Sequence, residues 1–300
     1  MTTAPIPDLT SPSTPVPGTT APIAGAVPRP LPLPLPLALG LSALFTVVKI
    51  TVTRQNRGIR LLILAVLFAM PILLAILIRR YQVNYHAPPV ENALIFGLLF
   101  PVLVPLAALL LASGMVQDDI EEQTLTYLLI RPIRRWAIYL AKLFGTIVSS
   151  WVRASIFTVA TLVAIHWGDE RLLGVILRER AVIALGLLAL ALSAYSAMFG
   201  WLSLWVRRSL VVGAIYIVIV EGLFGSIPFM VREATVIYYI RVLAVRWLDL
   251  PGADWSIELD RAVSASTCVI VLASIAVAFA ALGSLTFRTR EFRVKTPEGN

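Results

Sequence analysis

Six long apolar stretches constrain the fold of this chain more than any other feature of its sequence. They cover roughly residues 59–78, 92–114, 137–166, 181–206, 210–230 and 262–287. A helix needs about 20 consecutive apolar residues to cross the hydrocarbon core of a bilayer, and each stretch is about that long. Such segments are helical because lipid offers no hydrogen-bond partner to an open backbone. The sequence therefore predicts an all-α membrane protein with six transmembrane helices between residues 59 and 287.

The composition argues against a water-soluble fold. Hydrophobic residues make up 58% of the 300 and charged residues only 14%, whereas soluble domains carry about 25% charged residues. Too few charges remain to cover a globule with polar surface. The net charge of +8 follows from loop orientation in a membrane protein more often than from nucleic-acid binding. We therefore expect this chain to lie in the lipid bilayer and not to bind nucleic acid.

The sequence also lacks the usual elements of a cofactor site. The single cysteine, Cys268, excludes a disulfide framework and a thiolate metal cluster. Lysine occurs only at positions 49, 142 and 295, so no Gly-Lys-Ser/Thr phosphate-binding loop is present. His86 and His166 each stand without a second ligand at metal-binding spacing. We therefore predict that this chain binds no cofactor or metal and no ATP in such a loop.

The two ends of the chain differ from its apolar middle. Residues 1–36 hold 11 of the 20 prolines, which predicts a disordered or polyproline tail. Residues 37–58 begin apolar and end in cations, as an amphipathic helix lying in the membrane interface would. Residues 288–300 form a basic tail. Placing both termini in the cytoplasm puts 15 Lys and Arg inside and 9 outside, so we expect a multi-pass protein of the plasma or inner membrane in that orientation.

A charged segment, residues 117–131, separates the second and third apolar stretches. It opens with the acids Asp118, Asp119, Glu121 and Glu122, continues with apolar residues near helical spacing, and is ended by Pro132. This pattern predicts a short amphipathic helix. The pattern alone leaves two readings open, a docking site for another protein and a solvated loop that follows the charge rules.

The same segment resembles the loop between spans two and three of ABC-2-type permeases, the membrane subunits of ATP-binding-cassette transporters. The shared pattern is an acidic cluster, a Thr-Leu pair, two leucines, an Arg-Pro and following cations. The matching positions are Glu121, Glu122, Thr124, Leu125, Leu128, Leu129, Arg131, Pro132, Arg135 and Lys142. Gln123 stands where the family commonly has glycine. Residues 214–225, with Tyr216 and Glu221-Gly222-Leu223, are similar to span five of one subgroup of these permeases.

The resemblance implies a function and partners. It implies an ABC-2-type exporter permease fold with an N-terminal elbow helix, in a complex of two permeases (a homodimer or a paralogous heterodimer) and two cytoplasmic ATPases. The ATPases, and not this chain, would bind ATP and Mg. The resemblance implies no particular substrate. The residues expected to couple to the ATPase are Asp118, Asp119, Glu121, Glu122, Thr124, Leu125, Leu128, Arg131, Pro132 and Arg135.

Two residues that are charged at neutral pH lie deep inside the predicted spans, far from either end. Glu221 lies in the fifth span and Arg153 in the third, where a charge costs about 2.5–3.5 kcal/mol even on the lenient insertion scale. Glu221 either locks helix packing or lines the substrate path. Arg153 either pairs with Glu221, which would offset the desolvation of both, or extends to an interface.

Two other functional classes remain as alternatives. A secondary transporter would use an intramembrane acid such as Glu221 as an ion or proton site. An intramembrane enzyme would need a nucleophile with a base, paired aspartates or a His-Glu-x-x-His helix inside the membrane. The predicted spans contain no aspartate, so the enzyme is the weaker of the two alternatives.

Overall fold

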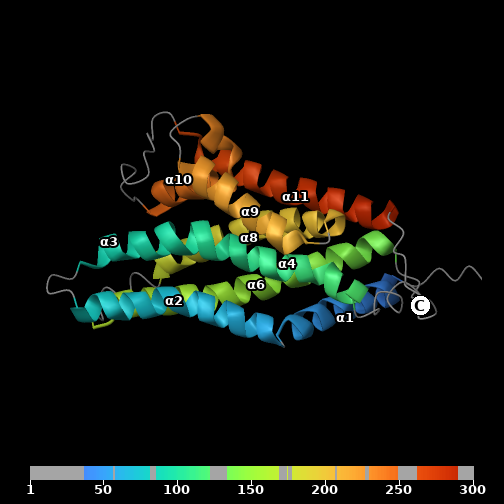
Figure 1. Ribbon diagram of the computed structural model, residues 1–300, viewed down its shortest axis with the longest axis horizontal. Helices are drawn as coiled ribbons and strands as arrows, with labels where there is room; N and C mark the ends of the chain where they lie inside the picture. Colours follow the sequence, from blue (N-terminus) through green and yellow to red (C-terminus); the bar gives the residue numbers. More distant parts are fainter. Residues whose placement is uncertain are drawn as a thin grey trace, which may run out of the picture. The chain divides into compact units, whose positions relative to one another are not determined.

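The computed structural model describes residues 37–56, 58–81, 86–121, 134–168, 174, 178–206, 208–226, 230–248 and 262–289. All regular secondary structure within these ranges is helical (Figure 1). The tail predicted at 1–36 lies outside the described residues, as do residues 290–300 of the tail predicted at 288–300 and residues 122–131 of the charged segment.

Five helical segments in the described part of the chain are long and apolar enough to cross a membrane. They are α2 (Ile59–Tyr81), the continuous run α3 (Ala87–Glu91), η1 (Asn92–Leu103) and α4 (Val104–Glu121), then α6 (Arg135–His166), α8 (Arg180–Trp205) and α11 (Ala265–Thr289). They correspond to five of the six predicted spans. The predicted all-α membrane fold is confirmed.

The predicted fifth span is shorter than expected. It consists of α9 (Ser209–Tyr216), the π-helical η2 (Ile217–Leu223) and the short η3 (Phe224–Ser226). Its apolar helix, Ser209–Leu223, is only about 22 Å long at 1.5 Å per residue, whereas the hydrocarbon core is about 30 Å thick. Hydropathy predicted a longer span because the apolar residues continue beyond Leu223, but the chain leaves the α-helical path at Ile217.

The chain then continues through η4 (Met230–Ala234) into α10 (Val236–Leu248). Val236, Ile240 and Leu243 of α10 are buried, and the helix packs against α8 and α11. Its sequence mixes aromatic and charged residues with apolar ones. The burial shows that α10 is part of the helical bundle.

Helix α1 (Leu37–Gln55) packs along the first half of α6 (Figure 1). The contact is close at Gly145 of α6, where an added Cβ would lie 3.4 Å from the Val48 carbonyl oxygen. A turn at Gly58, whose φ of +95° is one that residues with a side chain rarely adopt, separates α1 from α2. The predicted interfacial helix is thus attached to the bundle through α6.

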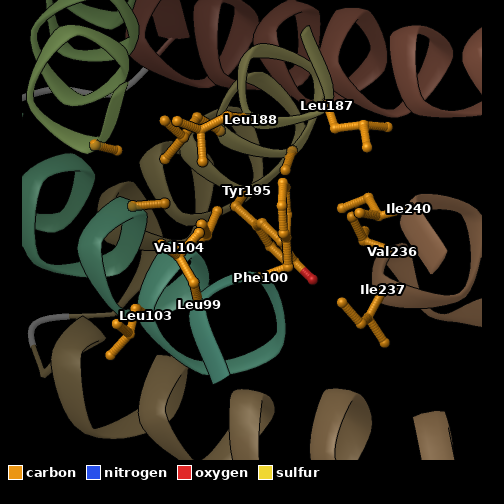
Figure 2. Packing of buried hydrophobic residues seen from close by; sticks show 14 of the residues in the cluster. Leu99, Phe100, Leu103, Val104, Leu187, Leu188, Tyr195, Val236, Ile237 and Ile240 are labelled. Carbon is orange, nitrogen blue, oxygen red and sulfur yellow. The ribbon is translucent and has the colours of Figure 1, made fainter. Parts of the chain in front are cut away.

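The core lies between η1, α4, α8 and α10. Figure 2 shows side chains from these helices converging on the ring of Tyr195. Outward-facing residues of α2, α9, η2 and α11 are instead large, apolar and exposed, as expected for helices solvated by lipid. Examples are Leu62, Val66, Leu73, Val211, Val218, Ile270 and Val277.

Candidate functional site at the ends of the predicted coupling segment

Asp119, in the last turn of α4, is a deeply buried residue of the charged segment (residues 117–131), which is predicted to couple to an ATPase. It is only 2% exposed. Lys142 of α6, 5% exposed, donates from Nζ to Asp119 Oδ2 and to the Met115 carbonyl oxygen, the latter at 2.8 Å. Arg54 of α1 donates from Nη1 to Asp119 Oδ1. One buried carboxylate therefore joins three helices.

The neighbouring Asp118 binds a fourth segment. Arg60, in the first turn of α2, donates from Nη2 to Asp118 Oδ1 at 2.8 Å and from Nη1 to Oδ2. Both side chains are about one-third exposed, so this ion pair is partly accessible to water. We call these five residues (Arg54, Arg60, Asp118, Asp119 and Lys142) the charged node.

The dipole of α4 explains why cations surround the two aspartates of the node. The C-terminal end of a helix carries partial negative charge, so two aspartates in the last turn of α4 are unfavourable by themselves. Cations from α1, α2 and α6 compensate both carboxylates. The ion pairs therefore hold the end of α4 against three other helices.

The structure shows the surroundings of two predicted coupling residues. Asp118 and Asp119 both bind cations of their own chain, and their part in coupling to an ATPase stays a prediction. Arg135 is exposed at the start of α6. Glu121 is the last residue of α4. The remaining predicted residues lie outside the described part: Glu122, Thr124, Leu125, Leu128, Arg131 and Pro132.

Arg153 contacts the end of α1. Its Nε donates to the Ser149 carbonyl oxygen at 2.9 Å and its Nη1 to the Gln55 carbonyl oxygen at 3.2 Å, while Nη2 binds Ser149 Oγ. Gln55 is the last residue of α1, where a cation is favoured by the helix dipole. The hypothesis that Arg153 pairs with Glu221 is therefore wrong in this structure, since the guanidinium turns back along α6 toward α1.

Glu221, 2% exposed, binds the first turn of α10. Its Oε2 accepts from the Ile237 backbone amide at 3.0 Å, and its Oε1 accepts from the Val236 amide at 3.3 Å and the Tyr216 hydroxyl at 3.3 Å. The first amides of a helix have no intrahelical partner, and they attract an anion. Of the two readings of Glu221, these contacts favour helix packing: the carboxylate fixes α10 to the fifth span.

A third buried acid was not recognised from the sequence. Glu91 of α3 is 2% exposed, and its Oε2 lies 3.1 Å from Arg180 Nη1 of α8 and 3.5 Å from His166 Nε2 of α6. In the sequence, Glu91 lies just outside the second apolar stretch, so hydropathy gives no indication of its burial. The only signal was the occurrence of His166 and Arg180 at the ends of their own spans.

Replacing Glu91 by glutamine is expected to lower the free energy of unfolding by about 1.5–3 kcal/mol, the range for hydrogen bonds to charged groups. The loss follows because a neutral amide at the buried position 91 cannot balance the charge of Arg180, whose side chain is 38% exposed. Thermal unfolding in lipid-containing micelles measures it. Glu179→Gln is the matched control, since Glu179 is exposed beside Arg180 and makes no capping hydrogen bond to α8. Equal stability of the two variants would contradict the assignment.

The sequence of this chain matches a known protein family. The model of the ABC-2 family transporter proteins matches residues 35–239, which include α1, the charged node and Glu221. A search of curated proteins found no match. The family's match over more than half of the chain agrees with the helical membrane fold. This chain belongs to the ABC-2 transporter family, and it is the multi-pass membrane permease of such a transporter rather than its ATPase.

Proposed function

We propose that this permease works with a separate cytoplasmic ATP-binding-cassette ATPase and with a second permease copy to export a substrate across the plasma or inner membrane. ATP and Mg are bound by the ATPase. The excess of Lys and Arg in the segments assigned to the cytoplasm supports a cytoplasmic location for both termini and for the charged node.

The observation that carries this proposal is the position of the charged node. Residues 122–133 connect α4 to α6, and the node ties the end of α4 to Lys142, near the start of α6. The node also holds α1 through Arg54 and α2 through Arg60. A force that an ATPase applies to the connecting segment would therefore act on four helices together.

This arrangement divides the acidic residues into two roles. Asp118 and Asp119 position helices within the permease, because their partners belong to the same chain. Glu121 and Glu122, the next acids along the chain, are proposed to contact the ATPase with the segment that follows them. The match of this segment to the family loop supports that assignment.

Reversing the charge of Glu121 and Glu122 to lysine tests the docking role. We expect the double variant to insert into the membrane normally and to lose ATPase binding and stimulated ATP hydrolysis, because the contact surface changes sign. Co-purification with the ATPase and ATP turnover measure the effect. Glu179→Lys, an exposed charge reversal at the opposite end of the bundle, is the control. Unchanged assembly and turnover in the double variant would exclude this segment as the docking site.

The alternative of a secondary transporter finds no support in the surroundings of Glu221. Both carboxylate oxygens accept hydrogen bonds from the backbone of α10. A carboxylate used in this way anchors a helix, and no observation favours its use as an exchangeable ion site.

A further inference from the structure

Tyr139 of α6 fills a narrow space between two other helices. Its side chain is fully buried. A Cβ added to Gly283 of α11 would overlap the Tyr139 hydroxyl and ring, and a Cβ added to Gly200 of α8 would lie 3.2 Å from the hydroxyl oxygen. The ring therefore sits where two helices carry glycine. We call the space bounded by Gly200 and Gly283 the glycine notch.

Shape rather than hydrogen bonding holds Tyr139 in the notch. Within the described part of the chain its hydroxyl has no hydrogen-bond partner. The ring packs 5.9 Å from that of Phe287 on α11. Close packing of this kind transmits displacement between helices, because a buried ring has no free volume in which to move separately.

The notch lies next to the charged node. Tyr139 precedes Lys142 by three residues and therefore shares one face of α6 with it. Lys142 binds the Met115 carbonyl oxygen, and the methyl group of Met115 would lie 3.2 Å from a Cβ at Gly200. Helices α4, α6, α8 and α11 thus meet within one turn of the node.

We propose that Tyr139 is a positioning residue that transmits movement of the charged node to α8 and α11 through the glycine notch. The proposal rests on the proposed function, because the movement comes from the ATPase. The node joins α1, α2, α4 and α6 by ion pairs, and the seated ring joins α6 to α8 and α11. Without the ring, the N-terminal helices move on ATP hydrolysis while the C-terminal helices follow incompletely.

A size-swap experiment on the complex reconstituted in vesicles tests this proposal, with ATP hydrolysis and transport measured together. Tyr139→Leu is expected to keep ATPase binding and stimulated hydrolysis but to lower transport per ATP about tenfold, within the range of typical coupling between sites. Tyr139→Phe is expected to match the native chain, because the hydroxyl makes no hydrogen bond. Gly283→Ala is expected to impair coupling, since the new methyl group overlaps the ring.

The decisive variant combines Tyr139→Leu with Gly283→Ala. The alanine methyl group occupies the space that the tyrosine ring leaves, so transport per ATP is expected to rise above that of either single variant. A parallel loss of hydrolysis and transport in Tyr139→Leu, or a double variant no better than the singles, would overturn the proposal. A native complex whose ATPase activity does not depend on the permease would overturn the proposed function, and this proposal with it.

Discussion

Replacing Asp119 by alanine is expected to lower the free energy of unfolding by about 3–5 kcal/mol, the range for removing one partner of a buried ion pair. The variant leaves the Lys142 ammonium, 5% exposed, without its carboxylate. It also frees Arg54 from the end of α4. Unfolding in a graded mixture of mild and denaturing detergents measures the loss.

Two comparisons make this prediction specific. Combining Asp119→Ala with Lys142→Met removes both buried charges, so the double variant should be more stable than Asp119→Ala alone. Asp118→Ala is the matched control in the same helical turn. Its pair with Arg60 is about one-third exposed, and such pairs contribute about 0–1 kcal/mol. Equal losses for the two aspartates would contradict the distinction between a buried and an exposed pair.

Replacing Glu221 by alanine is the second large effect that we expect. The change leaves the Val236 and Ile237 amides at the start of α10 without their acceptor inside the bundle. Each unpaired buried group costs about 1–3 kcal/mol, so the total loss is about 2–6 kcal/mol. Hydrogen exchange of the α10 amides in lipid nanodiscs should increase most in the first turn of the helix.

Smaller substitutions at this site distinguish the effect of losing the negative charge from the effect of losing the acceptors for the α10 amides. Glu221→Gln keeps one acceptor oxygen and should lose about half as much stability as the alanine variant. Tyr216→Phe removes a single hydrogen bond of 3.3 Å and should cost about 0.5–1.5 kcal/mol. If Glu221→Ala leaves stability and α10 exchange unchanged while transport is lost, the carboxylate lines the substrate path and the anchoring role is wrong.

The transmembrane architecture was largely predictable because hydropathy is a local property. A run of about 20 apolar residues has few alternatives to a membrane-spanning helix, whatever its neighbours are. The fifth span shows where this argument fails. The run 210–230 is long enough in sequence, yet the chain changes helix type at Ile217 and ends its apolar helix at Leu223. Amino-acid composition does not indicate where a helix changes from α to π geometry.

The partners of the charged residues were less predictable, for two physical reasons. Asp119 pairs with Lys142 and Arg54, which lie 23 and 65 residues away, so its burial depends on the packing of three helices. Glu221 binds backbone amides, which every residue other than proline carries and which give no sequence signal. Considering side-chain charges alone therefore suggested Arg153 as its partner.

We infer that a separate ATP-binding-cassette ATPase drives this permease. Purification of the native complex in mild detergent, followed by mass spectrometry of the stoichiometric partners and an ATP hydrolysis assay, tests it most directly. We predict that an ATPase with a phosphate-binding loop co-purifies with the native chain and is lost from the Glu121→Lys, Glu122→Lys double variant. A native chain that purifies without such an ATPase, yet transports in vesicles driven only by an ion gradient, would contradict the claim.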